Sequence, residues 1–315
     1  MKIVVTGSGG RLGAALVREY SKRFHVTGFT RAQLDLADSD QLHRSLGQAE
    51  FDVLINAAAF TNVDQAEKEP EQAFKVNAEG PRVLAELCRA RNARLIHVST
   101  DYVFDGTKKE PYREDDEARP IGVYGQSKRA GEEAVLSVSH QHLVVRVSWV
   151  FGPDRPSFVD QMIDRARDNE TIAAVGDKVS TPSYTRDIAA MLLPAVDAGM
   201  DGNAGHSEVS TGGTDPGYSG ILHVANTGQC TWQEYAQEAV DCCHRVGIPL
   251  KTRQVGAIKL SDMKTWIARR PVHTVLSTEK YQGLSGVSPR PWREAVAEYV
   301  REFIAPKYQG PGAAI

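Results

Sequence analysis

Tyr124 and Lys128 lie four residues apart within residues 122–135, a segment with helical character. Positions i and i+4 share one face of a helix, so we expect the Lys128 ammonium close to the Tyr124 phenol. A free tyrosine titrates near pH ~10, and a nearby cation lowers its pKa toward neutrality. Such a pair can pass a proton to or from a carbonyl oxygen. The same spacing also occurs on ordinary amphipathic helices, so the surrounding sequence has to decide.

A glycine-rich turn near the N-terminus favours the chemical interpretation. Residues 2–6 are a β-branched run typical of a buried strand, and residues 14–20 have helical character. Between them, Gly7, Gly10 and Gly13 are spaced Gly-x-x-Gly-x-x-Gly. In this pattern the first glycine permits a tight turn, the second lets a pyrophosphate approach, and the third lets helix and strand pack closely. The helix N-terminus adds amide donors for phosphate, so we predict a dinucleotide site rather than an ordinary loop.

The second expected strand, residues 25–30, indicates which dinucleotide binds. Sites for NAD usually carry an acidic residue near the end of this strand for the ribose 2′-hydroxyl. This chain has Phe29-Thr30-Arg31 there and no carboxylate until Asp35. Thr30 and Arg31 can bind a 2′-phosphate, which predicts NADP(H) ahead of NAD(H). The alternative for Arg31 is a solvated cation in a loop.

Strands and helices alternate through the first half of the chain. Further strands are expected at residues 51–56, 94–99 and 143–147, and a long helix containing Asn77 at residues 71–91. This alternation predicts an α/β fold, a Rossmann-type doubly wound parallel sheet. The carboxyl ends of parallel strands meet at one edge, where ligands bind. The residues expected at that edge are Gly7, Ala58, Thr100 and Ser148.

The second half is expected to form a smaller, mostly helical lobe for the substrate. Its expected helices are residues 157–169, 232–246 and 292–303. The NADP-binding domain is then residues 1–151 plus roughly 178–226, and the substrate-binding lobe is roughly residues 152–177 and 227–315. Residues 200–220 are rich in Gly, Ser, Thr and Asp and are expected to be a flexible insertion.

Composition narrows the function further. The chain has 315 residues and a net charge of −3, which argues against a nucleic-acid partner. No apolar stretch approaches the length of a membrane span, and the N-terminus lacks a signal-peptide pattern. The four cysteines lack a paired motif and the nine histidines lack metal-ligand spacing. We therefore expect a cytoplasmic protein with reduced thiols and no bound metal.

Short motifs run almost from end to end of the chain. They are residues 6–13, Asn-Ala-Ala-Ala-Phe-Thr at 56–61, Val-Asn at 76–77, Ser-Thr-Asp-Tyr-Val-Phe-Asp-Gly at 99–106, Tyr-Gly-Gln-Ser-Lys at 124–128, Arg-Val-Ser-Trp at 146–149, Thr-Pro-Ser-Tyr-Thr-Arg-Asp at 181–187 and Ala-Arg-Arg-Pro at 268–271. In these motifs the chain resembles the extended short-chain dehydrogenase/reductases and, within them, the dTDP-4-dehydrorhamnose reductase family. The motifs at 99–106 and 124–128 are the most specific to that family.

The resemblance implies hydride transfer from the nicotinamide of NADPH or NADH to C4 of a nucleotide-linked 4-keto sugar. It makes Tyr124 the proton donor, Lys128 a ligand of the nicotinamide ribose, and Thr100 a partner of the carbonyl oxygen or the Tyr124 phenol. With the residues named above, the expected cofactor-binding set is Gly7, Gly10, Arg11, Leu12, Gly13, Thr30, Arg31, Asp35, Leu36, Ala58, Ala59, Thr61 and Asn77, together with the three catalytic residues. Within this set the resemblance places Gly10, Arg11 and Leu12 at the pyrophosphate and Asp35 and Leu36 beside the adenine. The expected substrate-binding set is Tyr102, Val103 and Trp149 at the sugar and Arg269 and Arg270 at the nucleotide diphosphate.

Several alternatives remain open at this level. Trp149 could instead pack in the core, Arg269 and Arg270 could be surface cations, and Arg186 is expected to form a structural ion pair with Asp187. Some members of the resembled family hold magnesium at a dimer interface through glutamates. This chain has Ala15 and Arg293 at the corresponding positions, so a homodimer is compatible with the resemblance but a bridging metal is not expected.

Two other functions compete with the reductase assignment. One is a regulatory NADP-binding subunit similar to that of methionine adenosyltransferase, which would act as a binding partner. Trp149 suits the sugar reductases and is not expected in that regulatory form. The other is 4-keto reduction of a different nucleotide sugar, since the distinction between sugars depends on small differences in pocket shape.

Overall fold

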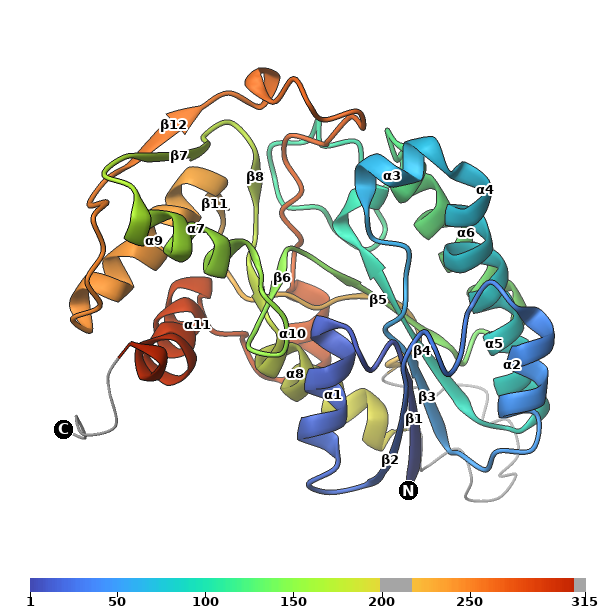
Figure 1. Ribbon diagram of the computed structural model, residues 1–315. Coiled ribbons are helices and arrows are strands. Elements are labelled where there is room, and N and C mark those ends of the chain that lie inside the picture. Colours follow the sequence, from blue (N-terminus) through green and yellow to red (C-terminus); the bar gives the residue numbers. More distant parts are fainter. Residues whose placement is uncertain (199–216, 309–315) are drawn as a thin grey trace.

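The computed structural model describes residues 1–198 and 217–308. It consists of a large sheet with helices on both faces and a smaller lobe above one end of it (Figure 1). The insertion expected at 200–220 lies outside the described residues, apart from 217–220.

The central sheet has six strands, all parallel, in the order β10-β5-β4-β3-β1-β2. The strands are β1 (Lys2–Thr6), β2 (His25–Phe29), β3 (Val53–Asn56), β4 (Arg94–Thr100), β5 (Leu143–Val147) and β10 (Gly220–His223). Chain order reverses between β1 and β3, and in open parallel sheets the ligand crevice lies outside the carboxyl ends at such a reversal. The predicted α/β class and doubly wound sheet are confirmed.

Helices cover both faces of the sheet (Figure 1). On one face, α1 (Arg11–Tyr20), α8 (Thr185–Asp197) and α10 (Glu279–Ser285) share one buried apolar cluster with the strands. On the other, α2 (Ser39–Leu46), α5 (Gly80–Ala90) and α6 (Val123–Val138) form a second. Tyr281 and Leu284 of α10 belong to the first cluster, so this part of residues 227–315 packs with the sheet and not with the smaller lobe.

The helix expected at 71–91 is interrupted. It consists of α4 (Pro70–Phe74), a π-helical turn (Lys75–Glu79) and α5, and it follows the short α3 (Val63–Lys68). Pro81 has no backbone N–H to donate to the preceding turn, which accounts for the break in the ladder. Asn77 sits in this turn, and α6 packs so closely on it that a Cβ at Gly131 would come 2.0 Å from the Asn77 carbonyl oxygen.

The smaller lobe is built on three helices, α7 (Phe158–Asp168), α9 (Trp232–Arg245) and α11 (Trp292–Tyr299). These confirm the predicted helices to within a few residues, since α11 continues as a π turn, Val300–Ile304. Three short ladders complete the lobe: β6 (Val150–Phe151) with β9 (Ser183–Tyr184), β7 (Ile172–Val175) with β12 (Val255–Ile258), and β8 (Val179–Ser180) with β11 (Cys230–Thr231). The single-turn 3₁₀ helices are Asp101–Val103, Leu260–Asp262 and Ala305–Lys307.

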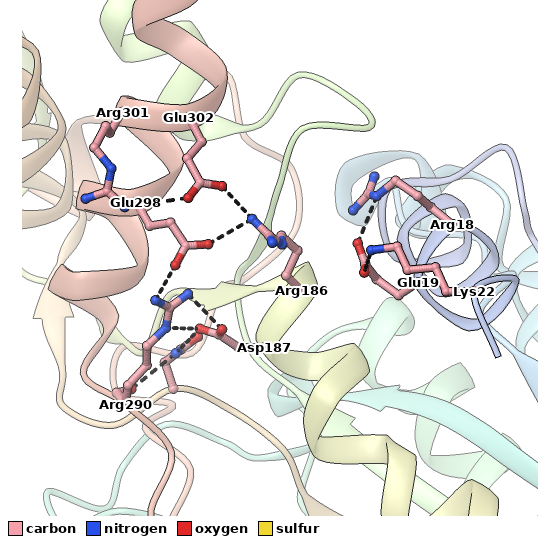
Figure 2. Close-up of polar contacts among 10 residues, drawn as sticks. Arg18, Glu19, Lys22, Arg186, Asp187, Arg290, Glu298, Arg301 and Glu302 are labelled. Atoms are coloured by element: carbon pink, nitrogen blue, oxygen red, sulfur yellow. Dashed lines mark hydrogen bonds and ion pairs between the residues drawn. The ribbon is translucent and has the colours of Figure 1, made fainter. Parts of the chain in front are cut away.

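A network of ion pairs attaches α11 to α8 (Figure 2). Arg186 Nη1 lies 3.0 Å from Glu298 and 2.6 Å from Glu302, while Arg290 joins Asp187 to Glu298. The expected pair between Arg186 and Asp187 is therefore wrong, because adjacent residues on a helix point to different sides. Each instead finds a partner from the C-terminal part of the chain.

Two features of the structure bear on the expectations from composition, namely the state of the cysteines and the character of the helices. All four cysteines are buried and free. Among the described residues, no helix combines the length and the apolar character needed to cross a membrane.

Candidate active site

The glycine turn places backbone atoms at the reversal of the sheet. Gly7 directly follows β1 and has a φ of +70°, and a Cβ there would lie 2.7 Å from Cα of Ala58, just beyond β3. A Cβ at Gly13 would lie 2.2 Å from the Gly7 carbonyl oxygen, so α1 could not pack this closely with a larger residue. Only glycine meets both demands, and the close approach opens the backbone to a ligand.

The start of α1 faces the same edge. Its N-cap is Gly10, which makes no side-chain cap, and the first turn contains no acidic residue. Such an end offers backbone N–H groups and a favourable dipole to a phosphate. The Arg11 guanidinium was expected at the pyrophosphate, but it donates to the carbonyls of Val150, Arg155 and Pro156. Only the Arg11 amide therefore remains for the phosphate, and the Leu12 side chain is buried in the core.

Beyond β2, Arg31 is the accessible cation. Its side chain is 74% exposed and lies 3.6 Å from Asp35, a loose pairing that leaves the guanidinium available. The Thr30 hydroxyl donates to Gln33, which occupies its one donor. The residues present thus fit a cofactor with a 2′-phosphate at Arg31. Leu36, expected beside the adenine, is buried in the core, so only its backbone can line that region.

The segment that follows β3 is held in place by hydrogen bonds with Asn77. Its side chain accepts from the Phe60 amide at 2.8 Å and donates to the Phe60 carbonyl and to Ser127. Asn77 is fully buried, so the direct cofactor contact expected for it is wrong. Its role is to hold the turn on which Ala58 and Ala59 are partly exposed and Thr61 is exposed.

Tyr124 and Thr100 meet at the carboxyl edge of the sheet. Tyr124 lies in the first turn of α6, Thr100 ends β4, and their side chains are hydrogen-bonded. The helix is packed against the strand end, since a Cβ at Gly125 would lie 2.2 Å from the Tyr102 carbonyl oxygen. Partial burial raises the pKa of Tyr124 to about 12, and the hydrogen bond with Thr100 only partly opposes this. The phenol therefore holds its proton until a ligand changes its surroundings.

Lys128 does not face Tyr124 in this arrangement, although both lie on α6. Its Nζ donates to the Val98 carbonyl at 2.7 Å and lies 3.3 Å from Nε2 of His97. Burial lowers the pKa of Lys128 to about 8, with Glu132 acting in the opposite direction. The expectation that Lys128 lowers the pKa of Tyr124 is therefore wrong for this side-chain position, because the ammonium is held against β4.

Two buried charges beside Thr100 were missed by the sequence analysis. Asp101 accepts hydrogen bonds from Thr100 and from Ser148, the latter at 2.9 Å. Burial raises the pKa of Asp101, and nearby Lys178 partly offsets this. Lys178 donates to the Pro271 carbonyl at 2.6 Å and lies 5.0 Å from the ring centre of Tyr102. Lys178 comes from the smaller lobe, so no local pattern could have paired it with Asp101.

Trp149 lies at the entrance to the smaller lobe. Its φ of +44° is unusual for a residue with a side chain and indicates that the surrounding structure holds it in place. Its ring centre lies 4.7–5.4 Å from those of Phe158, Trp232 and Tyr235. Trp149 is only partly buried, so it combines packing on one side with an accessible face on the other.

Of the other expected substrate residues, Tyr102 is accessible and Val103 is not. Tyr102 is partly exposed and contacts the Tyr124 ring edge-on, with ring centres 5.7 Å apart. Val103 is fully buried with Phe104, Tyr112 and Leu276, so a contact of its side chain with sugar is wrong.

The Arg270 side chain also pairs with other residues of the protein. It makes two hydrogen bonds to Asp64, at 3.1 and 2.7 Å, and lies over Trp266. The diphosphate role expected for Arg270 is therefore wrong for this arrangement, because its charge is already paired. Arg269 is exposed and its side chain makes no hydrogen bond or ion pair with the described residues, so its role at the diphosphate stays a prediction.

A glycine turn at the reversal of a parallel sheet, with a tyrosine and a threonine meeting at its carboxyl edge, defines an extended short-chain dehydrogenase/reductase. The family model described as RmlD substrate binding domain matches residues 1–305. The chain is 39% identical to a dTDP-4-dehydrorhamnose reductase of Mycolicibacterium smegmatis over 315 residues, covering 98% of this chain and 88% of that protein. It therefore belongs to the dTDP-4-dehydrorhamnose reductase family.

Two further relatives bear on cofactor and substrate. A solved dTDP-4-dehydrorhamnose reductase of Bacillus anthracis, in complex with NADP, superposes with a TM-score of 0.84 at 28% identity, covering 96% of this chain and 99% of that one. A protein of Streptomyces antibioticus named as a probable dTDP-4,6-dihydroxy-2-methyloxan-3-one 4-ketoreductase is 33% identical over 313 residues, covering 98% and 97%. Both relatives therefore match over nearly their full length.

Proposed function

We propose that this protein reduces the 4-keto group of dTDP-4-dehydrorhamnose to give dTDP-L-rhamnose, using NADPH. The family membership supports the reaction class and the dTDP-sugar substrate. The observation that carries the proposal is the meeting of Tyr124 and Thr100 beside the glycine turn, where a proton donor is needed next to a dinucleotide.

Bound NADPH supplies the hydride for the sugar carbon. Tyr124 then gives its proton to the carbonyl oxygen, and Thr100 keeps the phenol oriented from the end of β4. The Thr100 hydroxyl is itself held, since it donates to Asp101 and accepts from the Tyr102 amide. Lys128 acts as the second member of the pair once its ammonium turns from β4 toward Tyr124 and the nicotinamide ribose.

The substrate residues follow from exposure and contacts. Trp149 presents an accessible aromatic face, and the C–H faces of a sugar pack well on such a ring. Tyr102 lies beside Tyr124 and is positioned to contact the sugar. Arg269 is the remaining candidate for the diphosphate, because Arg270 is already paired with Asp64.

The test is oxidation of NADPH by the purified protein, followed at the nicotinamide absorbance with and without dTDP-4-dehydrorhamnose. Tyr124→Phe is expected to lower kcat by roughly 10²–10⁴-fold and to leave NADPH affinity nearly unchanged, since only the proton donor is lost. Tyr102→Phe is the matched control, because it removes a neighbouring phenol and should affect KM more than kcat. Full activity in Tyr124→Phe would refute the assignment.

Two outcomes would point elsewhere. Turnover with a related dTDP-4-keto sugar but not with dTDP-4-dehydrorhamnose would retain the chemistry and change the substrate, which the Streptomyces antibioticus relative makes a specific alternative. Tight NADPH binding without turnover of any keto sugar would favour a regulatory subunit similar to that of methionine adenosyltransferase.

A further inference from the structure

His97 lies in the middle of a buried hydrogen-bond chain that ends at Lys128. The Thr6 hydroxyl lies 2.6 Å from Oδ1 of Asn56, and Nδ2 of Asn56 lies 2.9 Å from Nδ1 of His97. On the far side of the imidazole, Nε2 lies 3.3 Å from Nζ of Lys128. The chain thus crosses β1, β3 and β4 and reaches α6 without leaving the protein interior.

The direction of this chain is set at Asn56. Its Oδ1 accepts from the Ala58 amide at 3.1 Å, and a backbone N–H can only donate. The amide nitrogen of Asn56 must therefore be the atom that faces His97, and it donates to Nδ1. A neutral imidazole carries one proton, so with Nδ1 accepting, the proton of His97 lies on Nε2 and points at Lys128.

This assignment decides which form of Lys128 fits. An ammonium group has three donors and no acceptor, so it cannot accept from the Nε2–H of His97. The neutral amine can accept there with its lone pair and still donate to the Val98 carbonyl at 2.7 Å. The site on β4 therefore matches the neutral amine, and a proton added to Lys128 makes two donors face each other.

We propose that His97 is a positioning residue for Lys128: its Nε2–H holds the neutral amine against β4, and protonation by solvent releases the side chain toward Tyr124 and the cofactor. The inference rests on the proposed function only for the destination of the released ammonium. The holding contact itself belongs to the protein without ligands.

The surrounding charges agree with the amine as the group that titrates. Burial lowers the pKa of His97 well below its usual range, and the adjacent Lys128 lowers it further. Burial lowers the pKa of Lys128 to about 8. Glu132, held by Arg146 of β5, is the carboxylate that acts on Lys128, and the other titratable groups on the same elements are Tyr124 on α6 and Asp101 directly after β4.

The first experiment determines the tautomer of His97 directly. Nitrogen-15 NMR of histidine-labelled, cofactor-free protein distinguishes a protonated from an unprotonated ring nitrogen, and His97→Asn identifies the signal by its loss. We expect a neutral ring with its proton on Nε2 throughout the neutral pH range. A proton on Nδ1, or a charged imidazolium, would overturn the proposal without touching the reductase assignment.

The second experiment measures Lys128 in two variants. His97→Asn keeps an acceptor for Asn56 and removes the donor to Lys128, whereas His97→Gln places an amide near the Nε2 position that can turn its oxygen to the ammonium. Carbon-13 NMR of labelled lysine should show Lys128 titrating near 8 in the parent protein. In both variants the midpoint should rise by about one unit or more.

The pH dependence of NADPH binding gives an independent readout. If the ammonium is the binding form, affinity falls as pH rises through the Lys128 midpoint, and this loss should move to higher pH in His97→Gln. If the variants lower thermal stability but change neither the titration midpoint of Lys128 nor the pH at which NADPH affinity falls, His97 has only a structural role. Should neither variant fold, the His97 signal is assigned in the parent protein by sequential backbone NMR assignment, and the tautomer measured there still decides.

Discussion

Two buried lysines near Tyr124 have matching surroundings and different counter-ions. Lys128 and Lys178 are both 1% exposed, both donate to a backbone carbonyl, and burial lowers the pKa of each to about 8. Lys178 has Asp101 close by, whose other partners are neutral hydroxyls. The carboxylate that raises the pKa of Lys128 is Glu132, which is already held by Arg146.

The difference separates a fixed charge from a movable one. Asp101 has no arginine partner in the part of the chain that the structure describes, so Lys178 is its counter-ion and joins the end of β4 to the smaller lobe through Pro271. Lys128 has no carboxylate of its own among the described residues, so its charge gains little from staying on β4. A cation that is not needed for neutrality can serve a ligand instead.

The largest expected effect concerns the ion pair that satisfies Glu132. Arg146→Met should lower the free energy of unfolding by about 3–5 kcal/mol at neutral pH, because it leaves a buried carboxylate without its bidentate partner. Denaturant unfolding measures this. The control is Arg129→Met, which removes a partly exposed partner of the same carboxylate and should cost less than about 1 kcal/mol. Equal losses would show that Glu132 does not depend on Arg146.

Arg146→Met also sharpens the comparison of the lysines. With Arg146 gone, Lys128 becomes the nearest buried cation to Glu132, and its pKa should move upward toward its ordinary value. Lysine-labelled NMR would show this for Lys128 and no comparable change for Lys178. If the pKa of Lys178 rose as well, the two lysines would not have separate electrostatic environments.

The next effect is a pH dependence of stability. The pKa of Lys178 is about 8 in the folded protein against 10.5 in the unfolded chain, so between these values the unfolded chain holds more protons. Stability contributed at this site therefore rises with pH across that window. Relative to Lys178→Met, the parent protein should gain up to about 3 kcal/mol from pH 8 to pH 10.5, measured by denaturant unfolding. If the free energy of unfolding depended on pH in the same way in both proteins, Lys178 would not be the source of this pH dependence.

The variant Lys128→Met tests whether the two lysines differ in cofactor binding although they contribute alike to stability. Its pH dependence of unfolding should resemble that of Lys178→Met, since both lysines start from the same lowered pKa. NADPH binding, measured by calorimetry, should weaken about tenfold or more in Lys128→Met and change little in Lys178→Met. Equal weakening in both variants would contradict the division into a fixed and a movable cation.

The parts that the sequence could predict are those decided by local pattern. The β-branched strands, the turn at Gly7, Gly10 and Gly13 and the helices of the smaller lobe all follow from short-range preferences. Tyr124 and Lys128 could likewise be singled out by their spacing. The π turn at Asn77 was missed because it depends on Pro81 interrupting a segment that otherwise reads as one helix.

The parts that could not be predicted are buried polar contacts between distant segments. Lys178 and Pro271 are 93 positions apart, and His97 and Lys128 are 31 apart. Arg270 was assigned to a ligand because arginine suits phosphate, whereas Asp64 of α3 already pairs with it in the structure. A charged residue can be assigned to a ligand only after its partners within the protein are known.

The smallest expected effect tests the accessible cation of the cofactor site. Arg31 is paired only loosely with Asp35, so its guanidinium can turn to a 2′-phosphate with little loss. Arg31→Ala should therefore weaken NADPH about tenfold, which corresponds to about 1.4 kcal/mol, and leave NADH nearly unchanged. Asp35→Asn is the opposite control, because it removes the competing carboxylate and should strengthen NADPH slightly. If Arg31→Ala weakened both cofactors alike, Arg31 would not recognise the 2′-phosphate, and the preference for NADPH would have to come from elsewhere in the site.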